Sequence, residues 1–221
     1  MKGVSVSTTD LIFAGIDISS GRKPLAYAVI DHDLKIILLE KCDISYVMDH
    51  LDQHKKVMLG VNLLSGKRSG SSQSAQKIFS DVEQKIIHAG FKPYLTNNAP
   101  KQWVETNPLE CFRSLSGQIP QSRRTLGGLL QRALILYGEG LQIDDPMEFF
   151  EEITRHHLLA GVMPMELLYS ASEVDALASA YITWMLINKP VQVDLTRNIG
   201  EGMILIPRED KNWWRKKPSN R

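Results

Sequence analysis

The chain has 221 residues, of which 43% are hydrophobic and 23% charged, so disorder along its whole length is excluded and one domain with a full core is expected. Lys and Arg total 26 against 25 Asp and Glu, which excludes a protein that is basic throughout but leaves room for a local basic patch. Two cysteines, Cys42 and Cys111, are too few for a disulfide scaffold or a cysteine-based zinc site.

Residues 1–10 are polar and rich in Ser and Thr, which is unlike a secretory signal. The sequence also lacks a run of eighteen apolar, uncharged residues, so a transmembrane helix is not expected. A cytoplasmic protein with no membrane partner is therefore the prediction.

Short apolar runs near the N-terminus are separated by turn residues and predict an antiparallel meander of three strands, over residues 11–17, 25–30 and 34–39. Helical spacing follows over residues 44–54, and then a fourth strand over 57–61. Because this strand comes after a helix, it is expected to pair in parallel through a crossover.

The second half of the chain is mainly helical. Residues 65–74 are rich in Gly and Ser and predict a loop. After it the pattern predicts helices over 76–89, 109–115, 126–137, 147–159 and 172–186, with strands over 102–105 and 203–206. Early strands followed by alternating helices and strands predict a mixed sheet with helices on both faces.

Three acidic residues stand where acids are unexpected. Asp17 ends a strand that should be buried, and Glu105 lies in a later strand, where Glu is a poor fit. Asp175 begins a helix that carries no further charge up to Asn188. Each acid has a structural alternative: a turn cap for Asp17, an exposed edge position for Glu105, and a helix capping box for Asp175.

Carboxylates from two strand ends and one helix start form the kind of oxygen-rich site that binds Mg²⁺ or Mn²⁺. Divalent ions in such sites can stabilise both the attacking and the leaving oxygen of a phosphoryl transfer. Asp17, Glu105 and Asp175 are therefore predicted as catalytic residues and metal ligands.

Four short motifs occur in a fixed order, Gly15-Ile16-Asp17, Glu105-Thr106-Asn107-Pro108, Asp175-Ala176 and Gly200-Glu201-Gly202. In order and spacing they resemble the predicted RNase H-like nucleases called domain of unknown function 429, from about residue 12 to residue 207. The resemblance implies an α/β fold of RNase H type, with a mixed five-stranded sheet flanked by helices and extra helices inserted before the last core helix. It implies one domain over residues 1–207 and a divalent-metal-dependent nuclease activity.

The chain departs from this family after the fourth strand. The family pattern there is Asp-x-Pro-x-Gly, whereas this chain reads Asn62-Leu63-Leu64-Ser65-Gly66. Asn62 can offer a metal a carbonyl oxygen but no charge. The departure favours a weakened or single-metal site, or a binding module without catalysis.

Basic residues near the predicted strand ends are candidates for phosphate contacts, namely Arg22, Lys67 and Arg68, with solvated loop charge as the alternative. Residues 208–221 form a basic tail with six Lys or Arg against two Asp or Glu. Trp213 and Trp214 lie among these charges, which suits stacking on single-stranded nucleic acid or, equally, anchoring of the tail on the body.

Three functions follow, in order of preference. The first is a Mg²⁺- or Mn²⁺-dependent nuclease acting on DNA or RNA. The second is a catalytically weakened module that binds nucleic acid or protein. The third is an actin-like, ATP-binding phosphotransferase, because residues 15–21 faintly resemble the first phosphate loop of that superfamily, although its members are typically much longer.

Overall fold

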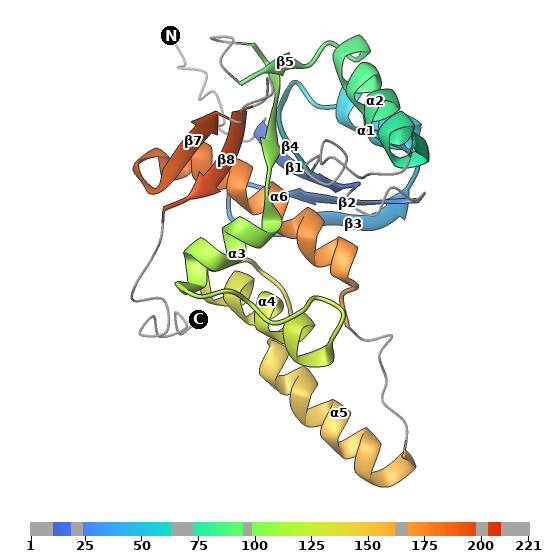
Figure 1. Ribbon diagram of the computed structural model, residues 1–221, viewed down its shortest axis with the longest axis vertical. Helices are drawn as coiled ribbons and strands as arrows, with labels where there is room; N and C mark the ends of the chain where they lie inside the picture. The colour runs from blue at the N-terminus through green and yellow to red at the C-terminus, as the bar shows by residue number, and fades with distance from the viewer. Residues whose placement is uncertain are drawn as a thin grey trace, which may run out of the picture.

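The structure is a computed structural model, and it describes residues 11–18, 24–62, 73–94, 99–161, 168–197 and 203–208. Its centre is one mixed sheet with the strand order β3-β2-β1-β4-β6-β8-β7, and β5 pairs with β6 beside this path. Helices lie on both faces of the sheet (Figure 1).

The first five positions of this order form the core of the fold. β1 (Leu11–Asp17), β2 (Leu25–Ile30) and β3 (Ile36–Cys42) pair antiparallel, as the short connections predict. β4 (Lys56–Asn62) pairs in parallel with β1, and β6 (Lys101–Thr106) pairs in parallel with β4. These strand orders and directions are those of an RNase H-like sheet, so the predicted fold class is confirmed.

The sheet is larger than the five strands expected. β7 (Val193–Arg197) and β8 (Met203–Pro207) form an antiparallel hairpin, and β8 extends the sheet by pairing in parallel with β6. β5 (Lys92–Pro93) has two residues. β5 is too short to leave a periodic pattern in the sequence. β7 is a short segment in which apolar and polar residues alternate directly after a helix, so neither strand was predicted.

The third strand also begins two residues later than predicted. Leu34 has a φ of 63° and belongs to the turn, where the Asp31 side chain accepts hydrogen bonds from the backbone of Asp33 and Lys35. Leu34 is nevertheless buried, because its side chain packs into the core from the turn. Its hydrophobicity therefore reflects burial rather than strand structure.

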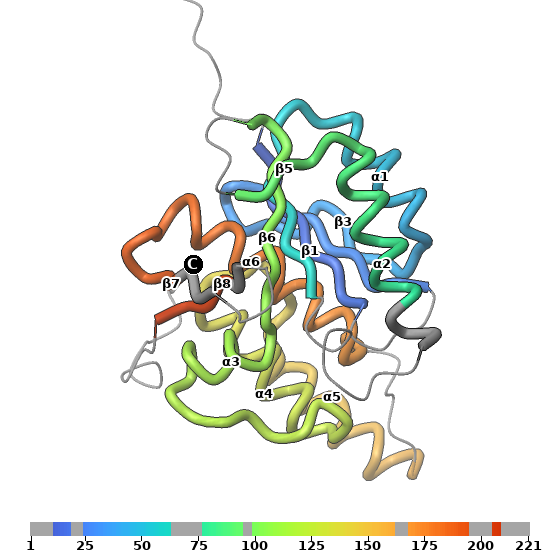
Figure 2. The backbone as a smooth tube through the Cα atoms, turned by 45° about the horizontal axis from the view of Figure 1, so that its top comes forward, coloured from blue at the N-terminus to red at the C-terminus, as the bar shows by residue number. Residues whose placement is uncertain are grey.

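Two hydrophobic clusters cover the two faces of the sheet. α1 (Ile44–Asp52) and α2 (Gln73–His88) cover one face. α6 (Ala171–Asn188) covers the other, backed by α3 (Pro108–Ser116) and α4 (Leu126–Gly138). α5 (Pro146–Ala160) projects away from this body (Figures 1 and 2).

α6 lies unusually close to the sheet. A Cβ atom on Gly15 of β1 would lie 2.0 Å from the carbonyl oxygen of Ala176, and one on Gly60 of β4 would lie 2.6 Å from that of Ser179. Small residues on both sides therefore permit the contact. None of the helices in the described ranges is long and apolar enough to cross a membrane.

Candidate functional site

Asp17 and Asn62 end two neighbouring parallel strands. Gly15 faces α6, and because side chains alternate along a strand, Asp17 faces α6 as well. Asp17 pairs in register with Asn62, whose Nδ2 donates a hydrogen bond of 2.8 Å to Asp17 Oδ1. Asp17 is only 2% exposed, so its carboxylate is held inside the protein.

Asp175 approaches Asp17 from the first turns of α6 and is 4% exposed. It does not form the capping box of this helix: the backbone N–H of Ser170 donates to Glu173 Oε2 at 2.7 Å. The close packing of α6 on β1 and β4 brings its first turns to the ends of those strands. Asp17 and Asp175 together are called the acid pair below.

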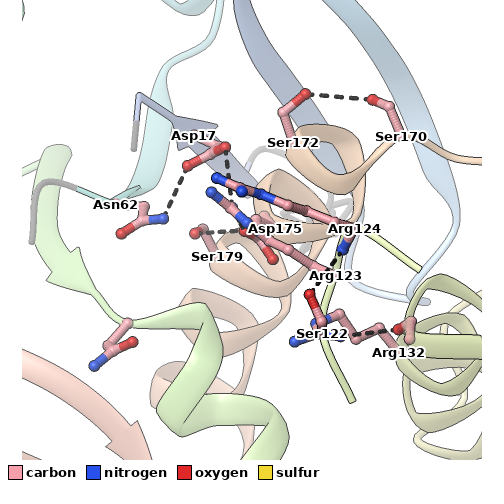
Figure 3. Close-up of polar contacts among 12 residues, drawn as sticks. Asp17, Asn62, Ser122, Arg123, Arg124, Arg132, Ser170, Ser172, Asp175 and Ser179 are labelled. Atoms are coloured by element: carbon pink, nitrogen blue, oxygen red, sulfur yellow. Dashed lines mark hydrogen bonds and ion pairs between the residues drawn. The ribbon is translucent and has the colours of Figure 1, made fainter. Parts of the chain in front are cut away.

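The acid pair is joined by the guanidinium of Arg123 (Figure 3). Arg123 Nη1 donates to Asp175 Oδ2 and lies 4.0 Å from Asp17 Oδ2. Arg123 comes from the turn before α4, more than 50 residues before Asp175 and 100 after Asp17 in sequence. Three distant segments therefore supply one charged cluster.

The turn that carries Arg123 is fixed through its backbone. Thr125 caps α4, since its Oγ1 accepts from the N–H of Gly128 at 3.1 Å, and its own N–H donates to the Ser122 carbonyl at 3.0 Å. Arg132 of α4 is buried and donates from Nη1 to the carbonyls of Gln121 at 2.6 Å and Gly128 at 2.9 Å. The base of the turn is thus clamped from inside the protein.

Burial dominates the electrostatics of the site. Desolvation and the charge of Asp17 raise the pKa of Asp175 to about 7, while Arg123 and Arg132 act in the opposite direction. Desolvation lowers the pKa of Arg132, because burial disfavours the charged form of a base as it does that of an acid. Asp175 can therefore hold or release a proton near neutral pH.

Glu105 lies on the neighbouring strand, but on the other face. It pairs in register with Val61, which packs against α1 and α2, whereas the next residue, Thr106, donates from Oγ1 to Ser179 of α6 at 2.9 Å. Glu105 is 3% exposed. The structure thus brings Asp17, Asn62 and Asp175 together and directs the Glu105 side chain away from α6, so its role as a metal ligand stays a prediction.

Within the described ranges, no three His, Cys, Asp or Glu side chains come together so that they could hold a metal ion. The donors that do converge are two carboxylates and the amide of Asn62, and these are hard oxygen ligands of the type Mg²⁺ prefers. Because Mg²⁺ commonly keeps several waters and uses one or two carboxylates, this set fits one such ion and is too small for two.

The residues predicted to contact phosphates and bases are not among those that the structure describes. Arg22, Lys67, Arg68, Trp213 and Trp214 are all outside the described residues. Arg208, the first residue of the predicted tail, donates from Nε to Asp194 Oδ1 at 2.8 Å.

Arg123 is the functional candidate that sequence reasoning missed. Its position in the pair Arg123-Arg124 before a helix is typical of a solvated loop charge. The only signal in the sequence was the buried acids themselves, because carboxylates inside a protein are usually paired with a cation, protonated or bound to a metal. The sequence does not say which of the 26 Lys and Arg residues supplies it.

No family model matches the chain, and no curated protein matches it. Among solved structures it is similar to RuvC of Thermus thermophilus, with 14% identity and a TM-score of 0.44, over 81% of this chain and 96% of that chain. The fold assignment rests on the strand order, and membership of the family called domain of unknown function 429 stays a prediction.

Proposed function

We propose that the protein is a divalent-cation-dependent phosphodiesterase that acts on nucleic acid, with the acid pair of Asp17 and Asp175 at its centre. The observation that carries the proposal is the burial of these two carboxylates side by side at the ends of β1 and the start of α6. The resemblance of the sequence motifs to predicted RNase H-like nucleases points to the same chemistry.

The acid pair lowers the stability of the folded protein. Burying two like charges opposes their ionisation, as the raised pKa of Asp175 indicates, and well-packed apolar residues usually serve a core at least as well. The helix start does not need Asp175, because Ser170 and Glu173 already form its capping box. A buried carboxyl with a strongly raised pKa, as Asp175 has, is typical of functional sites.

Asp17, Asp175 and the carbonyl oxygen of Asn62 are the residues that would hold the cation. A bound divalent ion would supply Lewis-acid stabilisation of charge on a phosphate. Asn62 orients Asp17 through its hydrogen bond, and α6 keeps the pair sheltered from bulk water. Glu105 remains a candidate further acid, and Arg22, Lys67, Arg68 and the tail remain candidate phosphate contacts.

The test is cleavage of labelled single-stranded and duplex oligonucleotides with Mg²⁺ or Mn²⁺. We expect Asp17→Asn and Asp175→Asn each to lower the cleavage rate at least 100-fold and to weaken Mn²⁺ binding measured by calorimetry. Asp49→Asn, which removes an exposed acid on α1, should change neither. Glu105→Gln reports whether Glu105 belongs to the site.

A non-catalytic binding module is the second candidate, favoured by one specific observation. Asn62 stands where the resemblance leads one to expect an acid, and it donates a hydrogen bond to Asp17. Oligonucleotide binding without cleavage, unaffected by Asp17→Asn, would support this function and contradict the phosphodiesterase.

A further inference from the structure

The guanidinium of Arg123 lies at the same oxygen atoms that a divalent cation would need. It contacts Oδ2 of Asp175 directly and lies 4.0 Å from Oδ2 of Asp17. Both carboxylates are almost completely buried, so the space available for a positive charge between them is restricted. Figure 3 shows Arg123 reaching toward the acids from the turn before α4, with the side chain of Arg124 beside it.

Arg123 differs from Arg132 in how it is held. Arg132 is buried and its guanidinium donates to two backbone carbonyls, so it is part of the fold. The Arg123 side chain is 36% exposed, and the turn beneath it is fixed by backbone contacts of Ser122 and Thr125. The side chain can therefore rotate toward solvent while the turn stays in place.

The acid pair already has positive charge beside it. The guanidinium of Arg123 contacts the pair directly, and that of Arg132 acts on Asp175 through the interior. A divalent cation that entered while Arg123 stayed would be repelled at short range in a poorly solvated site. Cation binding and the Arg123 contact are thus expected to exclude each other.

We propose that Arg123 is a resident cation that a divalent metal must displace from Asp17 and Asp175, so that it sets the metal affinity of the site. The inference rests on the proposed function, because it assumes that the acid pair binds a divalent ion. The cost of displacement makes the site bind metal weakly in the resting protein. It also keeps the buried acids compensated whenever no metal is bound.

The first experiment is a calorimetric titration of the full chain with Mn²⁺ alone. Arg123→Gln should bind Mn²⁺ at least 10-fold more tightly than the unaltered protein, because the competitor is gone. Arg123→Lys, which keeps a positive charge, should stay within about 3-fold. Arg155→Gln removes a guanidinium from an exposed pair with Glu151 on α5 and is the matched control, with unchanged affinity.

A second experiment uses the unaltered protein and so does not depend on whether a variant folds. Phenylglyoxal modifies accessible guanidinium groups, and peptide mass spectrometry reports the rate at each arginine. Mn²⁺ should accelerate modification of Arg123 several-fold and leave that of Arg155 unchanged. Equal rates at Arg123 with and without bound Mn²⁺ would overturn the inference.

The outcomes separate this inference from the function on which it rests. If the unaltered protein binds Mn²⁺ and Arg123→Gln binds it equally or more weakly, the displacement is rejected, but the proposed metal site is not. No Mn²⁺ binding by either protein rejects the proposed function as well. Tighter binding that disappears when Asp17→Asn is added to Arg123→Gln establishes that the competition occurs at the acid pair.

Discussion

The two faces of the sheet differ in how they bury polar groups. On the α1/α2 face large apolar side chains fill the interface, and the hydroxyl of the fully buried Tyr27 forms a hydrogen bond of 2.9 Å with His50 Nδ1. On the α6 face small residues bring helix and sheet together, and charged Asp17 and Asp175 lie at the strand ends. The first arrangement serves packing over most of its area and buries one acid, Glu105, whereas the second brings two buried carboxylates together, where they can share a cation.

The largest expected effect comes from breaking the close approach on the α6 face. Gly15→Ala would place a Cβ 2.0 Å from the carbonyl oxygen of Ala176, which backbone atoms cannot relieve locally. We expect the free energy of unfolding to fall by more than about 4 kcal/mol, measured by urea denaturation. Loss of α6 packing should also abolish Mn²⁺ binding.

Gly138→Ala is the matched control for this substitution. A Cβ at Gly138 meets no atom within 4 Å, and the residue ends α4 in an exposed position. Alanine there should be neutral or stabilise the protein by up to about 1 kcal/mol. If both variants lost the same unfolding free energy, the tight contact of α6 with β1 would not be the reason that residue 15 must be glycine.

The second effect concerns pH. Burial and Asp17 raise the pKa of Asp175 from 3.8 to about 7, so the folded protein binds an extra proton between these values. The contribution of Asp175 to stability is therefore complete below pH 4 and declines as the pH rises toward 7, by up to about 4 kcal/mol. Asp175→Asn removes this dependence.

Unfolding free energies at pH 4, 5.5, 7 and 8 test this prediction. The difference between the unaltered protein and Asp175→Asn should shift in favour of the variant across this range. Asp49→Asn, on an exposed helix position, should keep a constant difference. A difference for Asp175→Asn that is equally flat would mean that the charge of Arg123 fully offsets the burial.

A smaller effect is expected from restoring the missing acid. Asn62→Asp replaces the donor to Asp17 with a third buried charge, so the metal-free protein should lose about 2 kcal/mol of stability. Mn²⁺ affinity should rise in calorimetry, because the site gains a charged ligand. If neither quantity changes, Asn62 does not contribute to the site.

The sequence predicted the fold better than the site, for physical reasons. Apolar patterns located the five core strands, and the order of strands and helices along the chain predicted a mixed sheet. β5 was too short to leave such a pattern. Asp17 and Asp175 could be singled out because a charge in a buried strand or helix is conspicuous, and the structure brings these two carboxylates together. Which face Glu105 occupies depends on strand register, and the Arg123 contact depends on a turn far away in sequence, so neither could be read locally.

The smallest expected effect lies on the other face and sharpens the contrast between the two. Tyr27→Phe removes the hydroxyl that forms a hydrogen bond with His50, while the ring keeps its place in the core. Burial raises the pKa of Tyr27, so this hydroxyl stays protonated at neutral pH. The loss of one hydrogen bond should cost about 1 kcal/mol of unfolding free energy.

Mn²⁺ affinity and its response to Arg123→Gln should be unchanged in Tyr27→Phe, because α1 packs on the opposite side of the sheet from the acid pair. A change in metal affinity in Tyr27→Phe would instead mean that the sheet couples its two faces, and that the charge on the α6 face is not independent of the packing on the α1/α2 face.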